Sequence, residues 1–115
     1  MYKRQIEEQG LLARAVSVGA RLRAGLLGLA ERDLPVAAVR GRGLMLGVAL
    51  SADVAAETVA AGLRHGVIVN AIGTRTLRLV PPLTISDAEV DEAVRRLGRA
   101  LVEAVAGAGA GAPPS

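Results

Sequence analysis

The sequence predicts an α+β fold in which helices cover a small, mainly antiparallel sheet of three to four strands. Its 115 residues, 51% hydrophobic and 22% charged, suit one small globular domain. Apolar residues recur at helical spacing in three segments and alternate at strand spacing between them. The expected order is a long helix, two strands, a second helix, two more strands and a last helix.

The first helix is expected over residues 5–32. Its small and apolar residues have the three-four spacing of one helix face: Leu12, Ala15, Gly19, Leu22, Leu26 and Leu29. The other face carries charges that we expect to lie in solvent: Arg14, Arg21, Arg23 and Glu31. Leu34 and Pro35 end this helix, because a residue before proline disfavours helical geometry.

A pair of strands follows. Residues 36–40 are expected to form a short strand, and Gly41 to Gly43 a tight connection. In residues 44–50, bulky leucine and valine alternate with Met45, Gly47 and Ala49, so one face of that strand is bulky and the other is nearly bare. The bare face predicts a close neighbour.

The second helix is expected to begin at a cap, Asp53, and to end where Gly66 follows His65. One face of it would carry Ala55, Val59 and Leu63. Two short strands come next, over residues 67–70 and 77–80, separated by a loop and stopped by Pro81 and Pro82.

The last helix has a clear start signal. Ser86 and Glu89 have the spacing of a capping box, and Ile85 and Val90 that of a hydrophobic staple. A buried stripe continues along it: Val90, Val94, Leu97, Leu101 and Val105.

The two ends of the chain differ in composition from the rest. Residues 1–5 hold the only lysine and the only aromatic residue, a break that indicates a non-native leader. Residues 6–106 are expected to be the folded domain. Residues 107–115, rich in Gly, Ala and Pro, have little to bury and are expected to form a flexible tail.

Composition excludes several kinds of chemistry. The chain has no cysteine and one histidine, which removes disulfides, thiolate nucleophiles and metal sites built on several His or Cys. Lys3 is the only lysine, so the domain has no internal candidate for a Schiff base. A net charge of +3, dispersed arginines and a single aromatic residue argue against nucleic-acid binding. Without an apolar span or signal peptide, we expect a cytoplasmic location and no membrane partner.

Three candidate motifs have simpler interpretations. Gly41 and Gly47 are six residues apart and precede a strand, whereas a dinucleotide-binding loop needs an interval of five and a following helix. His65 at a helix end and Asn70 at a strand end are expected to satisfy local backbone groups.

Arg78 is the strongest candidate for a functional residue. It interrupts the apolar run of residues 77–80, and a buried guanidinium is costly unless an anion meets it. The nearest acidic residue in sequence is Asp87, so the anion would come from elsewhere in the fold, another domain or a ligand carboxylate. The alternative is an edge-strand arginine whose head group lies in water.

Four segments together resemble a known family: Val39 to Val48, Gly66 to Asn70, Leu77 to Leu83, and Ile85 with Ser86. In this order and spacing they are similar to the C-terminal small domain of class III pyridoxal-phosphate aminotransferases. Within that class the likeness is greatest to enzymes that act on acetylornithine. The resemblance spans residues 5–105.

The resemblance implies a fold-type I enzyme that transfers an amino group between N-acetylornithine and 2-oxoglutarate in arginine biosynthesis, as a cytoplasmic homodimer. It implies that Arg78 binds a substrate carboxylate. Pyridoxal 5'-phosphate would be held by a large domain that precedes this segment, so the chain alone is expected to be inactive. The alternatives are an ornithine, succinylornithine or 4-aminobutyrate aminotransferase, or a non-catalytic α+β binding module.

Overall fold

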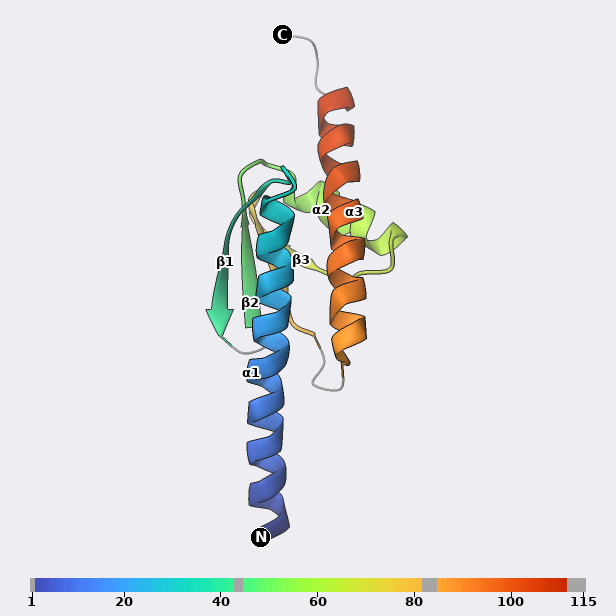
Figure 1. Ribbon diagram of the computed structural model, residues 1–115. Coiled ribbons are helices and arrows are strands. Elements are labelled where there is room, and N and C mark those ends of the chain that lie inside the picture. The colour runs from blue at the N-terminus through green and yellow to red at the C-terminus, as the bar shows by residue number, and fades with distance from the viewer. Residues whose placement is uncertain (1, 43–44, 82–84, 112–115) are drawn as a thin grey trace.

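The computed structural model describes residues 2–42, 45–81 and 85–111 (Figure 1). Within them the order is α1 (Tyr2–Ala30), β1 (Val36–Arg42), β2 (Met45–Leu50), α2 (Ala55–Arg64), β3 (Asn70–Ile72), β4 (Thr76–Leu79) and α3 (Asp87–Gly111). The four strands form one antiparallel sheet in the order β1-β2-β4-β3. The α+β fold expected from the sequence is therefore confirmed.

One face of the sheet packs against the helices and forms the core. Strand residues that face the helices are buried, and they include Val39, Leu46, Val48, Leu77 and Leu79. Helices α1 and α3 lie side by side over this face and project past opposite ends of the sheet (Figure 1). The molecule is consequently elongated, with extents of 65 × 23 × 22 Å. No helix in the described part of the chain is both long enough and apolar enough to cross a membrane.

The buried face predicted for α1 is confirmed in most of its residues. Leu22, Leu26 and Leu29 are buried, as is Val18, which the predicted stripe did not include. Leu12 is 68% exposed, contrary to expectation. The reason is geometric, since the N-terminal turns of α1 extend beyond the elements on which the helix packs (Figure 1).

The β1–β2 pair is longer than expected. β1 continues through Arg42, and Gly41 pairs with Leu46. Gly41 adopts a φ of 121°, and a Cβ there would lie 2.0 Å from the Met45 carbonyl oxygen, so only glycine fits. The connection at residues 43–44 lies outside the described residues. In the described part nothing but neighbouring strand backbone comes near Gly47, so the close neighbour expected on the bare face is not found.

Helix α2 corrects two expectations about its ends and its faces. Asp53 does not cap it, because the N-cap residue is Val54 and the Asp53 carboxylate instead accepts hydrogen bonds from Thr74 Oγ1 at 2.9 Å and Arg75 Nε at 2.7 Å. Its buried residues include Thr58, whereas Leu63 is 63% exposed. The expected C-terminus is confirmed.

That C-terminus combines two neighbouring residues. His65 is the C-cap, and Gly66 takes a positive φ of 79°.

The third strand lies further along the chain than expected, at Asn70–Ile72 instead of 67–70. Val67 and Val69 are buried but pair with no strand. The expected loop, residues 71–76, is shorter in the structure, because residues 71, 72 and 76 belong to the paired strands β3 and β4. The remaining residues form a tight turn in which Gly73 has a φ of 67°.

Helix α3 begins as expected and ends later. The Ser86 backbone N–H donates to Glu89 Oε1 at 3.0 Å, and the Glu89 N–H donates to Ser86 Oγ at 3.1 Å, which confirms the capping box. Val90, Leu97 and Leu101 are buried, but Val105 is 42% exposed and its neighbour Ala104 occupies the buried face instead. The helix continues to Gly111.

Two glycines of α1 provide a paired test of the α1–α3 contact. A Cβ on Gly25 would lie 2.8 Å from Val94 Cγ2, whereas one on Gly28 would meet nothing within 4 Å. Gly28→Ala should raise the free energy of unfolding by about 0.5–1 kcal/mol through helix propensity. Gly25→Ala gains the same propensity but overpacks the contact at about 1–3 kcal/mol, so it should be the less stable variant. Urea unfolding compares them, and equal stabilisation by both would contradict the close approach of the helices.

Candidate site around Arg78

Arg78 lies on the open face of the sheet. It occupies the third position of β4, between Leu77 at 0% and Leu79 at 7% exposure, and it is itself exposed. The expectation that Arg78 is buried in apolar surroundings is therefore wrong. Successive strand residues point to opposite faces, so two leucines in the core require the arginine between them to face away from it. The alternative is right that the Arg78 side chain is exposed and wrong about the edge strand, because β4 lies between β2 and β3.

The strand register places Arg78 in a row across the open face. Arg40 of β1 pairs with Gly47 of β2, Gly47 pairs with Arg78, and Arg78 pairs with Asn70 of β3. Paired residues share a face, so two arginines and an asparagine lie on the same side with a glycine between the arginines. A Cβ on Gly47 would come no closer than 3.9 Å to any atom, so packing within the described residues does not require glycine there.

Arg78 and Asn70 also line a groove with a volume of about 480 Å³. Its walls are mostly apolar and include Ile68 and Val80, which are 80% and 60% exposed. An apolar groove with a few polar groups is the usual form of a small-molecule site, where the polar groups orient the ligand. Asn70, which the sequence assigned to a local backbone role, makes no side-chain hydrogen bond within the described residues and lies beside Arg78 instead.

Within the described ranges, no carboxylate neutralises Arg78. Asp87, its nearest acidic residue in sequence, lies 3.0 Å from Arg14 Nη1 and 3.8 Å from Arg21 Nη1. Because both carboxylate oxygens of Asp87 contact α1, this residue is already engaged. Arg78 therefore presents its hydrogen-bond donors to the open face, where a planar anion could accept two of them.

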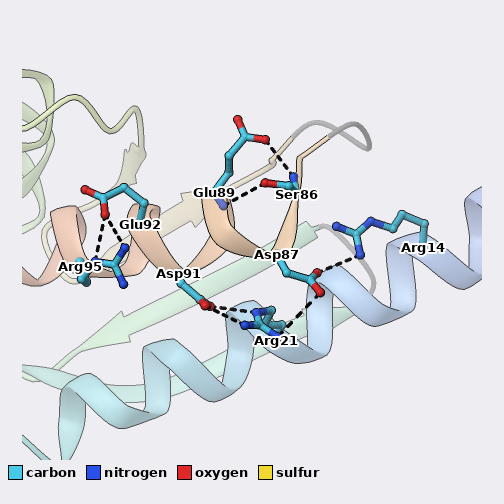
Figure 2. Close-up of polar contacts among 8 residues, drawn as sticks. All are labelled: Arg14, Arg21, Ser86, Asp87, Glu89, Asp91, Glu92 and Arg95. Carbon is cyan, nitrogen blue, oxygen red and sulfur yellow. Dashed lines mark hydrogen bonds and ion pairs between the residues drawn. The ribbon is translucent and has the colours of Figure 1, made fainter.

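Ion pairs between α1 and α3 hold one wall of the groove, to which Leu22 and Val90 contribute. Arg21 donates to both carboxylate oxygens of Asp91, at 2.9 Å from Nε and 2.7 Å from Nη2 (Figure 2). Arg14 donates to the Asp87 carboxylate at 3.0 Å (Figure 2). It also donates to the Ile85 carbonyl at 2.6 Å. Both arginines are partly exposed, as expected, but they also form ion pairs that the sequence analysis did not predict.

Arg23 is likewise engaged, since it donates to the carbonyl oxygens of Val39 at 2.9 Å and Gly41 at 2.7 Å. It ties α1 to the strand that carries Arg40. The charged face of α1 thus fastens the helix to both α3 and the sheet.

These contacts stabilise the charged form of each partner. The hydrogen bonds that Arg21 donates to Asp91 lower the pKa of Asp91 and raise the pKa of Arg21. Hydrogen bonds from Ser86 lower the pKa of Glu89 in the capping box. Each carboxylate is favoured in its charged form when the protein is folded.

The other wall of the groove is held by contacts at the end of α2. His65 Nε2 lies 2.7 Å from Glu103 Oε2, and Arg64 donates to the same carboxylate at 2.8 Å. These donors, first Arg64 and then His65, lower the pKa of Glu103. Arg96 reaches the Gly66 carbonyl at 3.4 Å, where the segment that leads to Asn70 begins. His65 therefore has a structural role, as the sequence suggested. Its partner on α3, Glu103, was not predicted from the sequence.

The residues described offer neither a metal site nor a cofactor lysine near Arg78. No three His, Asp or Glu residues among them gather in a way that could hold a metal ion. The only lysine of the chain, Lys3, belongs to the first turn of α1, which extends away from the sheet (Figure 1). What the site offers is an exposed guanidinium beside an apolar groove.

Comparison with known families gives one match over most of the chain. Residues 4–101 match the class-III aminotransferase family. The acetylornithine aminotransferase of Corynebacterium efficiens is 54% identical over 68 residues, covering 59% of this chain and 17% of that protein. The acetylornithine aminotransferase of Gloeobacter violaceus is 44% identical over 77% of this chain and 22% of its own length. The chain thus spans about a fifth of the length of these relatives.

Solved structures show the same fold. The N-acetylornithine aminotransferase from Stenotrophomonas maltophilia superimposes with a TM-score of 0.79 and 34% identity, over 84% of this chain and 28% of that one. The lysine aminotransferase from M. tuberculosis superimposes with a TM-score of 0.76 and 40% identity, over 86% of this chain and 23% of that one.

The ion pair between Arg21 and Asp91 predicts a salt- and pH-dependent stability. Because Asp91 has a lower pKa in the folded protein, its contribution is complete above the unfolded pKa and is lost as the pH falls through the folded value. Asp91→Asn should lower Tm at neutral pH and low salt. The difference from the parent should shrink below about pH 4 and in 0.5 M NaCl.

Asp33→Asn is the matched control, since it removes the same charge from a residue that makes no ion pair in the described part and keeps a side chain tolerant of its φ of 62°. A Tm difference for Asp91→Asn that stays constant with salt and pH would contradict the electrostatic origin.

Proposed function

Because the chain belongs to the class-III aminotransferase family, we propose that it forms the C-terminal small domain of an aminotransferase and supplies that enzyme's recognition of the substrate carboxylate. The observation that carries this proposal is Arg78, a guanidinium without a carboxylate partner in the described residues, at the border of an apolar groove. The sequence around it, Leu77 to Leu83, is one of two segments that in combination resemble the family specifically, the other being residues 40–44.

Arg78 suits this task through its geometry. A guanidinium offers parallel N–H donors that match the two oxygens of a carboxylate, so it fixes the orientation of a bound acid as well as its position. Asn70 lies on the next strand in register and adds an amide that can donate to or accept from the same ligand. Gly47 on the other side leaves room beside the guanidinium.

The substrates we propose are N-acetylornithine as amino donor and 2-oxoglutarate as amino acceptor, a reaction of arginine biosynthesis. Support comes from the relatives in Corynebacterium efficiens and Gloeobacter violaceus, which are both acetylornithine aminotransferases. In 2-oxoglutarate a carboxylate is bonded to the carbon that accepts the amino group, whereas N-acetylornithine loses the amine at the far end of its side chain from the carboxylate. Arg78 therefore suits the carboxylate beside the reacting carbon of 2-oxoglutarate.

The cofactor of this family is pyridoxal 5'-phosphate, which carries the amino group from donor to acceptor. The described residues near Arg78 include no lysine that could hold it, and Lys3 lies in the first turn of α1. We therefore assign cofactor binding to a large domain outside this chain and expect the chain alone to be inactive. A cytoplasmic homodimer is part of the same proposal, and it rests on the family resemblance.

A second candidate donor is a diamino acid without the acetyl group, such as ornithine or lysine. The M. tuberculosis lysine aminotransferase is 40% identical to this chain, compared with 34% for the Stenotrophomonas acetylornithine enzyme. Ornithine, succinylornithine and 4-aminobutyrate enzymes belong to the same set of alternatives. Arg78 would bind a substrate carboxylate in any of these enzymes, so the small domain alone does not separate them.

Arg78→Lys in the complete enzyme tests the role of the guanidinium. Lysine keeps the positive charge but loses the two-point geometry, so kcat/KM for 2-oxoglutarate should fall by about 10²-fold, equivalent to about 2.7 kcal/mol. The absorbance of bound pyridoxal phosphate should not change. Arg75→Lys, at the β3–β4 turn and outside the groove, is the matched control and should retain activity. Loss of the cofactor in Arg78→Lys would show that the residue does not act on substrate.

The choice of donor is tested by steady-state kinetics of the complete enzyme on acetylornithine, ornithine and lysine with 2-oxoglutarate as acceptor. The proposal predicts that kcat/KM is highest for acetylornithine. A preference for ornithine or lysine would identify the second candidate instead, while leaving the role of Arg78 intact.

A further inference from the structure

A second cavity lies between the turn that follows α1 and the middle of α3. Its volume is about 270 Å³, and three arginines line it, Arg32, Arg95 and Arg99, together with Gly98 and Val102. It shares no lining residue with the groove around Arg78. The function proposed above does not use it.

The backbone brings these arginines together by a close helix contact. A Cβ on Gly98 would lie 3.0 Å from Leu29 Cδ2, so the glycine lets the last turn of α1 approach α3. The chain then turns sharply, with the N–H groups of Arg32 and Leu34 both donating to the Leu29 carbonyl and Asp33 at a φ of 62°. Arg32 is thereby held beside α3.

Charge around this cavity is poorly balanced. Arg95 and Arg99 are four residues apart on α3, a spacing at which like charges repel. Arg95 pairs with Glu92, but the same carboxylate also binds Arg96 at 3.1 Å. Arg32 and Arg99 make no ion pair with any residue that the structure describes.

The acidic residues next to Arg32 do not correct this imbalance. Glu31 and Asp33 flank it in sequence, yet in the described ranges neither forms an ion pair. The cavity thus presents two uncompensated guanidiniums and a third that shares its carboxylate.

We propose that this cavity binds a compact, multiply charged oxyanion of the phosphate class, such as the diphosphate group of a small metabolite. Guanidinium groups bind phosphate oxygens in pairs, and several cations around one small volume favour an anion with more than one charge over a single carboxylate. The site is separate from Arg78, so it would regulate or tether the protein without taking part in amino transfer.

Titration of the chain with inorganic pyrophosphate tests this proposal, measured by calorimetry in 50 mM NaCl. Saturable binding is expected, with a Kd that rises steeply with salt. Arg32→Gln/Arg99→Gln should weaken it at least tenfold. Both residues are exposed and unpaired in the described part, so the variant should fold, which circular dichroism verifies. Arg75→Gln removes an equally exposed guanidinium outside the cavity and should keep Kd within twofold.

Amide chemical shifts locate the anion. Shifts concentrated at Arg32, Gly98 and Val102 would support the proposal. It would be overturned by shifts concentrated at Asn70 and Arg78, by equal affinity in the double variant and the Arg75→Gln control, or by the absence of saturable binding. None of these outcomes depends on aminotransferase activity, so failure here leaves the proposed role of Arg78 unaffected.

Discussion

Two buried leucines decide where the candidate site lies. Leu77 and Leu79 are 0% and 7% exposed, and their burial fixes which face of β4 meets the helices. A shift of the register by one residue would bring both leucines to the open face, a change that costs several kcal/mol of apolar burial. Arg78 therefore faces away from the core because its neighbours face into it. The rest of the site follows, since the register with Gly47 and Asn70 sets what lies beside the guanidinium.

Ion pairs and hydrogen bonds hold α1 against α3 and against the sheet. Arg21 and Asp91 join α1 to α3 across 70 residues of sequence, and Arg23 joins α1 to the carbonyls of β1. Exposed ion pairs individually contribute little to stability. Their main effect is on alignment, because they hold in place the helix surfaces from which Leu22 and Val90 line the groove. Burial provides most of the stability, and the charged contacts select one packing of the helices.

Local signals in the sequence predicted most of the fold. Three signals span only a few residues each and are confirmed: the strand alternation, within Met45–Leu50, the capping box of Ser86 and Glu89, and Gly66 at a helix end. Contacts between distant segments were not predictable in this way. Asp53 has the residue type and position of a helix cap, but Thr74 and Arg75 bind its carboxylate once the fold brings them near. A signal for the α1–α3 clamp was present, since Arg14 and Arg21 are seven residues apart and Asp87 and Asp91 four, spacings that place each pair on one helix face.

The sequence identifies Arg78 as the candidate residue, but the expectation that its side chain is buried is wrong. The strand pattern of leucine, arginine and leucine indicates one face in the core and one face open, and this period-two interpretation is sufficient to explain its exposure. The proposed role then depends on a ligand meeting the guanidinium on the open face. A crystal structure of the complete enzyme with a substrate acid bound would test this most directly. We predict two N–H···O contacts of about 2.7–2.9 Å between the Arg78 guanidinium and the substrate carboxylate. A carboxylate held by another residue, with Arg78 paired to an Asp or Glu of the enzyme, would contradict it.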